Sequence, residues 1–181
     1  TNSYGSLSVQ ANGAYSFLAN GPDSQKLAQG ATATLNFTYA VSDGELSATS
    51  ALTITVTGAN DAPTAQADQA SVIEDAVLVR TAANGLLSND SDVDAGTNLR
   101  ITSIRNGTSG TPQSVPSNGS ANLSNGYGTL TVASDGSYSF NADGADAQAL
   151  GVGASAQTSF TYTVSDGISS QTSTLTFTIQ G

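Results

Sequence analysis

The chain has 181 residues, 14 acidic and four basic side chains, and a formal net charge of −10 at pH 7. It contains neither His nor Cys, which excludes Ser-His-Asp and Cys-His nucleophiles, the usual zinc sites and disulfides. The negative charge repels phosphate backbones, so we expect no nucleic-acid partner. No apolar run reaches the roughly 18 residues that would predict membrane insertion.

An internal repeat organises the chain. Residues 4–58 align with residues 127–181 at a constant offset of 123 without a gap, and about 30 of these 55 positions are identical. Residues 60–125 have no earlier counterpart, so they form the first half of the unit that residues 127–181 complete. We therefore expect the C-terminal half of a preceding repeat at 1–58, whose beginning lies outside the chain, a linker at 59–63 and a complete repeat at 64–181.

The repeats have the period of β-strands. Leu, Ile, Val and Phe number 36, about a fifth of the chain, which borders on the composition of disordered proteins. These residues alternate with Ser and Thr, however, and the alternation favours folding. The alternating sets are Leu7/Val9, Tyr15/Phe17, Phe37/Tyr39/Val41 and Leu52/Ile54/Val56, with their copies 123 residues later.

Further strands are expected in the half without a copy, at Ser71–Ile73, Val77–Arg80 and Leu99–Ile104. Hairpin turns are expected at Asn12-Gly13 and Asp43-Gly44 and at their copies. About seven short strands per repeat predict an all-β fold, an immunoglobulin-like β-sandwich. The tyrosines at 4, 15 and 39 and their copies follow the alternation and are expected in the core or at tyrosine corners.

The stretch 105–126 is polar and long for a connection within a sandwich. We expect a surface excursion or an extra hairpin there, and the alternative is a loop that contacts a ligand.

Several motifs in order resemble a known family. The segments TGANDAP, EDAVLV, GLLSNDSDVD, GTLTV…DGSYSF and FTYTVSDG resemble VCBS-type repeats, which are cadherin-like tandem repeats of giant bacterial surface and secreted proteins, including RTX-type adhesins. The resemblance covers essentially the whole chain. It implies tandem immunoglobulin/cadherin-like β-sandwich repeats, about one and a half units here, in a calcium-stiffened extracellular stalk. The expected partners are then neighbouring repeats of the same chain.

Half of the acidic residues lie between positions 61 and 94. They are Asp61, Asp68, Glu74, Asp75, Asp90, Asp92 and Asp94. Clustered carboxylates repel one another unless a cation neutralises them, and Ca²⁺ takes six to eight oxygen ligands. For isolated residues such as Glu45 a merely soluble surface is the simpler interpretation. The Asp90-x-Asp92-x-Asp94 spacing is not an EF-hand, because Ala95 and Ile101 stand where that loop has Gly and Glu.

Sandwich topology groups these carboxylates, because loops fall alternately at the two ends of such a domain. We expect the loop at 90–94 to lie with the last hairpin turn, where the chain enters the complete repeat, and to meet the linker and the Asp23/Gln25 segment of the preceding repeat. Cadherin junctions place their ligands in similar loops. The candidate Ca²⁺ ligands at this junction are Asp23, Asn60, Asp61, Asp90, Asp92, Asp94 and Asp166.

A second, incomplete site is expected at the far end of the complete repeat, from Glu74, Asp75 and Asp146, with Gln148 beside them. Asp68 is not assigned, since it fits either the junction or the surface.

The leading hypothesis is a calcium-binding structural extender of a large bacterial surface or secreted adhesin, in which Ca²⁺ stiffens the inter-repeat junction for cell adhesion or biofilm formation. The alternative is a module that binds carbohydrate or protein at its loops, although the chain has no Trp for a glycan platform. We do not expect an enzyme, since only paired-carboxylate chemistry is available. The incomplete first repeat leaves open strand edges, so self-association is a further possibility.

Overall fold

The computed structural model describes residues 2–181, and the chain divides into two compact units. The first contains the residues up to Asp61 together with Val93–Thr97, and the second contains Ala62–Asp92 and Asn98–Gly181. Residues 93–97 thus belong to the first unit although the chain has already entered the second. Among residues 2–181, no helix is long and apolar enough to cross a membrane.

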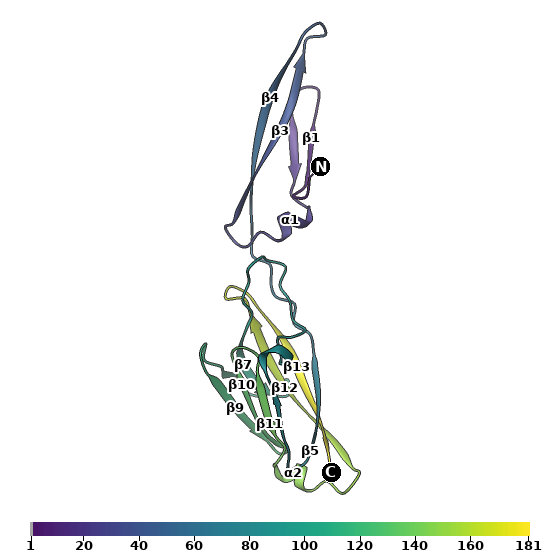
Figure 1. The fold of residues 1–181 in the computed structure, drawn as a ribbon, viewed down its shortest axis with the longest axis vertical. Helices are drawn as coiled ribbons and strands as arrows, with labels where there is room; N and C mark the ends of the chain where they lie inside the picture. Colours follow the sequence, from purple (N-terminus) through teal and green to yellow (C-terminus); the bar gives the residue numbers. More distant parts are fainter. Residues whose placement is uncertain (1) are drawn as a thin grey trace. The chain divides into compact units, whose positions relative to one another are not determined.

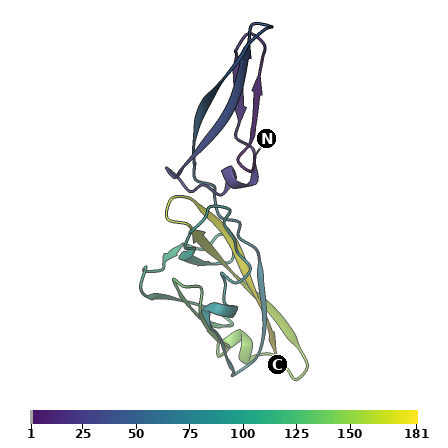
Figure 2. The ribbon, with the colours of Figure 1, turned by 45° about the horizontal axis from the view of Figure 1, so that its top comes forward.

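The first unit consists of two antiparallel hairpins and a one-turn helix (Figures 1 and 2). Strand β1 (Ser6–Val9) pairs with β2 (Tyr15–Leu18), and β3 (Thr32–Ser42) pairs with β4 (Ser47–Thr57). Helix α1 (Pro22–Gln25) lies between the hairpins in the sequence, and Pro22 stands where its missing N–H costs nothing. The rings of Phe17 and Phe37 join the hairpins, with centroids 6.0 Å apart.

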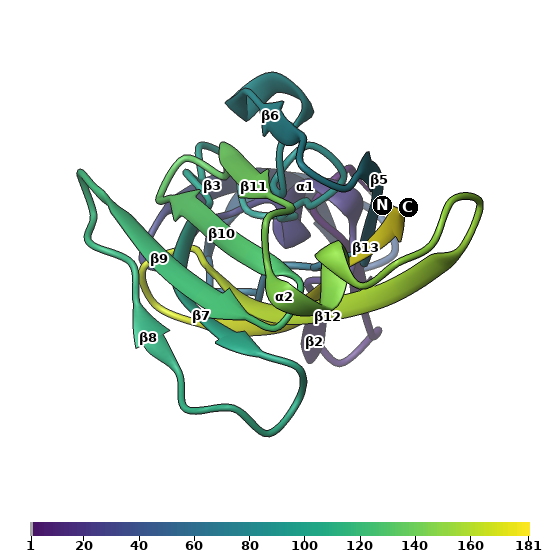
Figure 3. The same ribbon diagram turned by 90° about the horizontal axis from the view of Figure 1, so that it is seen from below.

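The second unit is a β-sandwich of two sheets (Figure 3). One sheet has the strand order β6-β11-β10-β9, and the other has the order β5-β13-β12-β7-β8. The strands are β5 (Asp68–Ile73), β6 (Val77–Arg80), β7 (Arg100–Asn106), β8 (Gln113–Ser114), β9 (Ser120–Asn125), β10 (Gly128–Ala133), β11 (Tyr138–Asn141), β12 (Ser155–Ser165) and β13 (Ser170–Gln180). A 3-10 turn η1 (Ala82–Asn84) and helix α2 (Ala145–Gln148) complete the unit.

Aromatic rings from both sheets form the centre of the core. Phe177 of β13 stacks on Phe140 of β11 with ring centroids 4.1 Å apart, and the edges of Phe160 and Tyr138 complete the cluster at about 6 Å. Along β13, the alternating Leu175, Phe177 and Ile179 are fully buried, as period-two patterning requires. The predicted all-β sandwich fold is confirmed.

Two expectations about strands need correction. The described residues of the second unit form nine strands rather than seven, because the polar stretch 105–126 contains β8 and β9. Of the two structures expected for this stretch, a surface excursion is wrong, since Val115 and Ala121 are buried in the core, whereas added hairpins are present, because β8 pairs with β7 and β9 pairs with β10. Strand β5 begins at Asp68, three residues before the predicted start, because the parallel pairing with β13 already begins at Asp68 and Leu175.

The tyrosine prediction holds in one unit and fails in the other. Tyr138 and Tyr162 are buried in the core of the second unit, whereas their counterparts Tyr15 and Tyr39 are exposed in the first. The alternation is the same in both repeats. What differs is the second layer, which only the complete repeat has to cover these side chains.

Candidate functional site

The acidic loop between η1 and β7 is fixed to the segment that precedes β5. Thr64 and Ser91 exchange backbone hydrogen bonds, of 2.7 Å from Thr64 N to Ser91 O and 3.1 Å in return. The Gln66 backbone N–H donates to Asp90 Oδ1 at 2.7 Å, and its side-chain Nε2 donates to the Asn89 carbonyl at 2.8 Å. These bonds lie within the second unit and hold Asn89 and Asp90 in place.

In this loop, Asn89 Oδ1 and Asp90 Oδ2 are buried and accept no hydrogen bond. A buried polar oxygen that accepts nothing costs free energy, and a charged one costs more. Burial also raises the pKa of Asp90, although the hydrogen bond from the Gln66 N–H acts in the opposite direction and lowers it. The loop therefore presents two oxygen atoms, Asn89 Oδ1 and Asp90 Oδ2, to which residues 2–181 donate no hydrogen bond that would offset their desolvation.

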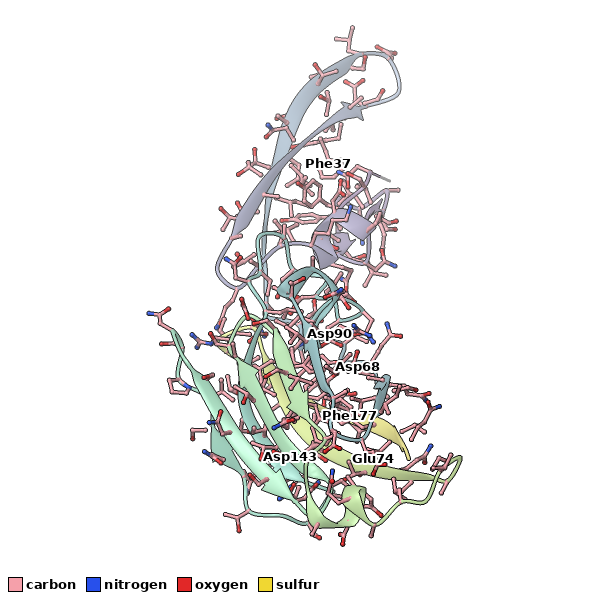
Figure 4. The ribbon with its side chains drawn as sticks, turned by 60° about the horizontal axis from the view of Figure 1, so that its bottom comes forward. Phe37, Asp68, Glu74, Asp90, Asp143 and Phe177 are labelled. Carbon is pink, nitrogen blue, oxygen red and sulfur yellow. The ribbon has the colours of Figure 1, made fainter. Side chains whose placement is uncertain are left out.

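Asp68, at the start of β5, adds a second carboxylate to this region (Figure 4). The Tyr162 hydroxyl lies 2.5 Å from Asp68 Oδ2 and 2.7 Å from the Gln66 carbonyl. Burial raises the pKa of Asp68 to about 6, and the charge of Asp90 contributes in the same direction, whereas the Tyr162 hydrogen bond lowers it. Burial and the Asp68 carboxylate raise the pKa of Tyr162 itself. Two carboxylates that repel each other in a partly desolvated place favour a cation.

Within the first unit, three chain segments meet. The Asp61 backbone N–H of the linker donates to Asp94 Oδ2 at 3.0 Å, and the Ala95 N–H donates to the Lys26 carbonyl, after α1, at 2.9 Å. Asp94 is buried. The structure thus brings together the α1 region, the linker and Asp94.

Asp23 and Asn60 of the predicted junction set make local contacts in the first unit. Asp23 Oδ1 pairs with Lys26 Nζ at 3.5 Å. The pKa of Asp23 is lowered, mainly by a hydrogen bond from the Ser3 side chain and to a smaller extent by Lys26. The Asn60 side-chain amide donates to the Asp61 carbonyl at 2.6 Å. Asp23 therefore already has a cationic partner.

Asp92 and Asp166 belong to the second unit. Asp166 Oδ1 accepts hydrogen bonds from the backbone N–H groups of Ile168 and Ser169, both at 2.6 Å. This closes the turn between β12 and β13, and Asp43 closes the β3–β4 turn in the same way. One oxygen of Asp166 thus has a structural role that sequence reasoning did not assign.

At the far end of the second unit, Gln148 Nε2 of α2 donates to Asp75 Oδ1 at 2.8 Å. Asp75 has a φ of 64°, the left-handed conformation that Asp tolerates better than most residues. Glu74 donates its backbone N–H to Gln180, and Asp146 donates its own to Gly126. Of the far-end set, Asp75 and Gln148 are therefore in direct contact. Among residues 2–181, however, no three His, Cys, Asp or Glu side chains form a ready-made metal cluster.

The residues near Asp90 that sequence reasoning did not include among the ligands are Gln66, Asn89 and Tyr162, while Asp68 was considered but left unassigned. Two signals could have found them. Asn89 stands directly before Asp90 in the acidic motif, and Tyr162 is the tyrosine of the repeated FTYTVSDG segment.

Comparison with known proteins places this geometry in context. The model of one protein family, described as bacterial cadherin-like domain, matches residues 60–181. A search of curated protein sequences finds no match. Among solved structures, the extracellular cadherin domains 1–5 of protocadherin gamma B2 align with 100% of this chain and 32% of theirs, at 15% identity and a TM-score of 0.51. At that identity the likeness shows the fold alone.

Two further structures are more distant. Mouse clustered PcdhgC3 EC1-3 aligns with 96% of this chain and 50% of its own, at 13% identity and a TM-score of 0.43. The endo-fucoidan hydrolase MfFcnA4 of glycoside hydrolase family 107 aligns with 99% of this chain and 22% of its own, at 16% identity and a TM-score of 0.38. Neither TM-score supports an argument about this chain, which spans at most half of the length of these three proteins.

Proposed function

The chain belongs to the bacterial cadherin-like domain family, and from this premise we propose that it is a calcium-binding, non-enzymatic structural module of an extracellular bacterial adhesin. We further propose that it works as one of a series of similar repeats, as in the VCBS-type repeats of RTX-type adhesins. Ca²⁺ would be bound by the segment Asn89–Asp94, with Asp68 and the linker residues Asn60 and Asp61 as further candidate ligands.

One observation carries the proposal. Asn89 Oδ1 and Asp90 Oδ2 are buried and accept no hydrogen bond, although the rest of the loop is firmly held by Thr64 and Gln66. Carboxylate and amide oxygens are the ligands that Ca²⁺ prefers. A bound cation would offset the desolvation of both atoms at once and would remove the repulsion between Asp68 and Asp90 that helps to raise the pKa of Asp68.

The protein supplies little positive charge of its own for this role. It has one lysine and three arginines, and the ion pair between Lys26 and Asp23 engages the lysine in the first unit. With four basic side chains against 14 acidic ones, a divalent metal is better supported than salt bridges as the means of neutralising the clustered carboxylates.

The proposed mechanical role follows from the path of the chain. The polypeptide passes between the units after Asp61, after Asp92 and after Thr97, and the Asn89–Asp94 segment contains one of these passages. A cation held by this segment would restrict its backbone freedom. We propose that Ca²⁺ makes the connection between repeats stiffer, so that a series of repeats behaves as a stalk for cell adhesion or biofilm formation.

Thermal unfolding and small-angle scattering of the 181-residue chain, with 1–10 mM Ca²⁺ or with EGTA, test the proposal. Ca²⁺ that binds the folded state stabilises it by about 2.7 kcal/mol at 100 times its Kd, so we expect a higher Tm and a narrower distribution of shapes with Ca²⁺. Asp90→Asn removes one charge at the site, and Asp92→Ala/Asp94→Ala removes two more.

Asp135→Asn is the matched control. It also removes one negative charge, but it does so in a turn where Asp135 Oδ1 already accepts hydrogen bonds from Ser137. We expect it to keep the full response to Ca²⁺, whereas the site variants lose it. A Tm and a scattering curve that are indifferent to Ca²⁺ in the unmodified chain would contradict the proposal.

A further inference from the structure

The first unit has an apolar face without a covering layer. A groove of about 580 Å³ runs between its two hairpins, lined among others by Val9, Tyr15, Phe37, Tyr39 and Val41. Val9 is 53% exposed, Tyr15 58% and Val41 61%. Monomeric proteins rarely leave a contiguous apolar surface of this kind uncovered.

The second unit shows what covers the same residues. The counterparts at offset 123 are Val132, Tyr138 and Val164, and they are 0%, 7% and 0% exposed. There, β9 and β6 flank the hairpin equivalent to β1–β2, while β7 and β5 flank the one equivalent to β3–β4. All four flanking strands come from residues 62–126, the half that the first unit lacks.

The start of the first unit already has the geometry of the connection to such a half. Asn2 and Gly5 form an antiparallel β-bridge, and Asn2 Oδ1 accepts a hydrogen bond from the Tyr4 N–H at 3.0 Å. In the second unit Asn125 pairs with Gly128 and accepts the Tyr127 N–H, also at 3.0 Å. Asn125 is the last residue of β9. The hairpin turn that would bring a β9-like strand alongside β1 is therefore formed at Asn2.

We propose that the open face of the first unit is a docking surface for an N-terminal half-repeat with the fold of residues 62–126, which enters through Asn2. Its strands would pair with the free edges of all four strands of the first unit. The register follows from the second unit. A β5-like strand would run parallel to β4, with the counterpart of Asp68 opposite Leu52, as Asp68 lies opposite Leu175. The inference is independent of the calcium proposal.

A second copy of this chain is a poor source of that half. Each chain contains one N-terminal half-repeat, at 62–126, but two C-terminal halves, at 4–58 and 127–181. A copy that donated its residues 62–126 would uncover its own Val132, Phe140 and Val164, which are fully buried. The exchange covers one apolar face and opens an equal one, so it gains no burial. The occupant is therefore a half-repeat additional to residues 2–181.

The experiment adds a second copy of residues 60–124 directly before Asn2 of the chain. The added residues then precede their counterparts in the second unit by 123 positions, which is the period of the repeat. We expect this extended chain to lose the ANS fluorescence that the 181-residue chain gives through its open groove. In hydrogen exchange, the edge amides of β1–β4 become protected, and sedimentation reports a monomer. The complete second unit serves as an internal standard for folding.

Ile104→Asp in the added half alone places a charge at a core position, since Ile104 is 1% exposed in the second unit. It should restore the ANS signal, whereas Gln113→Asp, at an exposed position of the added half, should not. An extended chain that still binds ANS and leaves the edges of β1–β4 unprotected would overturn the inference. So would a 181-residue chain that already buries the groove in a face-to-face dimer.

Discussion

Asp68→Asn should reduce the pH dependence of stability between pH 4 and 7, and Asp90, whose pKa is also raised by burial, should account for part of the dependence that remains. Asp68 is half-buried, and its pKa is raised from 3.8 to about 6. A carboxyl with a higher pKa in the folded than in the unfolded state stabilises the fold fully below about pH 4. That contribution is lost as the pH rises through 6. The asparagine stays neutral at every pH and keeps an acceptor for the Tyr162 hydroxyl.

The pKa of Asp68 differs by about two units between the unfolded and folded states. At 1.36 kcal/mol per unit, the effect on the free energy of unfolding is at most about 3 kcal/mol. Solvent screens a half-exposed carboxylate, so we expect about half of this, ~1.5 kcal/mol, in practice. Asp68→Asn should therefore exceed the unmodified chain in stability by about 1.5 kcal/mol at pH 8 in EGTA. Near pH 4 the two proteins should be equal.

Urea unfolding at half-unit pH steps from 4 to 8 measures this difference. Asp43 and Asp135, whose pKa values are lowered by hydrogen bonds, change stability only as the pH falls below about 4, so they do not interfere with this window. Asp135→Asn is the control and should keep the slope of the unmodified chain. If Asp68→Asn and the unmodified chain show parallel curves from pH 4 to 8, Asp68 is not the desolvated group described above.

Two pairs of substitutions test burial and backbone packing. Val164→Ala should destabilise the second unit by about 2 kcal/mol in urea unfolding, because Val164 is fully buried. The equivalent Val41→Ala should change the free energy of unfolding by less than about 0.5 kcal/mol, because Val41 is exposed. Equal losses in the two variants would contradict this difference in burial. Gly85→Ala places a Cβ 2.2 Å from the Gly136 carbonyl oxygen, so thermal unfolding followed by circular dichroism should give a Tm lowered by several degrees. In the control Gly151→Ala the added Cβ has no neighbour within 4 Å, so the Tm should not change. A tolerated Gly85→Ala would show that this contact can relax.

The repeat and its alternation made the sandwich predictable. Phe160, Tyr162 and Val164 alternate with threonines, and their copies at 37, 39 and 41 alternate with the small residues Thr38 and Ala40. The same pattern in both copies indicated a strand in each repeat. An extra hairpin at 105–126 was one of two expectations, but β8 and β9 could not be located within it, because the buried residues of this stretch, Val115 and Ala121, are few and small or isolated.

The site was only partly predictable, for a related physical reason. The acidic residues of the loop could be recognised from their spacing, and Asp90 from its place among them. The environment of Asp90 depends on Gln66 and Tyr162, which lie 24 and 72 positions away and reach it through tertiary packing. Whether a carboxylate closes a turn, as Asp166 does, or has a buried oxygen without a hydrogen bond, as Asp90 does, is decided by that packing and not by the local sequence.

Calorimetric titration of Ca²⁺ into the 181-residue chain at pH 7.5 tests the central claim most directly. We expect saturable binding of at least one ion, weakened about tenfold or more in Asp90→Asn and unchanged in Asp135→Asn, since Asp90 Oδ2 is buried without a hydrogen bond whereas Asp135 Oδ1 accepts hydrogen bonds from Ser137. No binding heat at millimolar Ca²⁺, or the same affinity in Asp90→Asn as in the unmodified chain, would contradict the assignment of a calcium site to this loop.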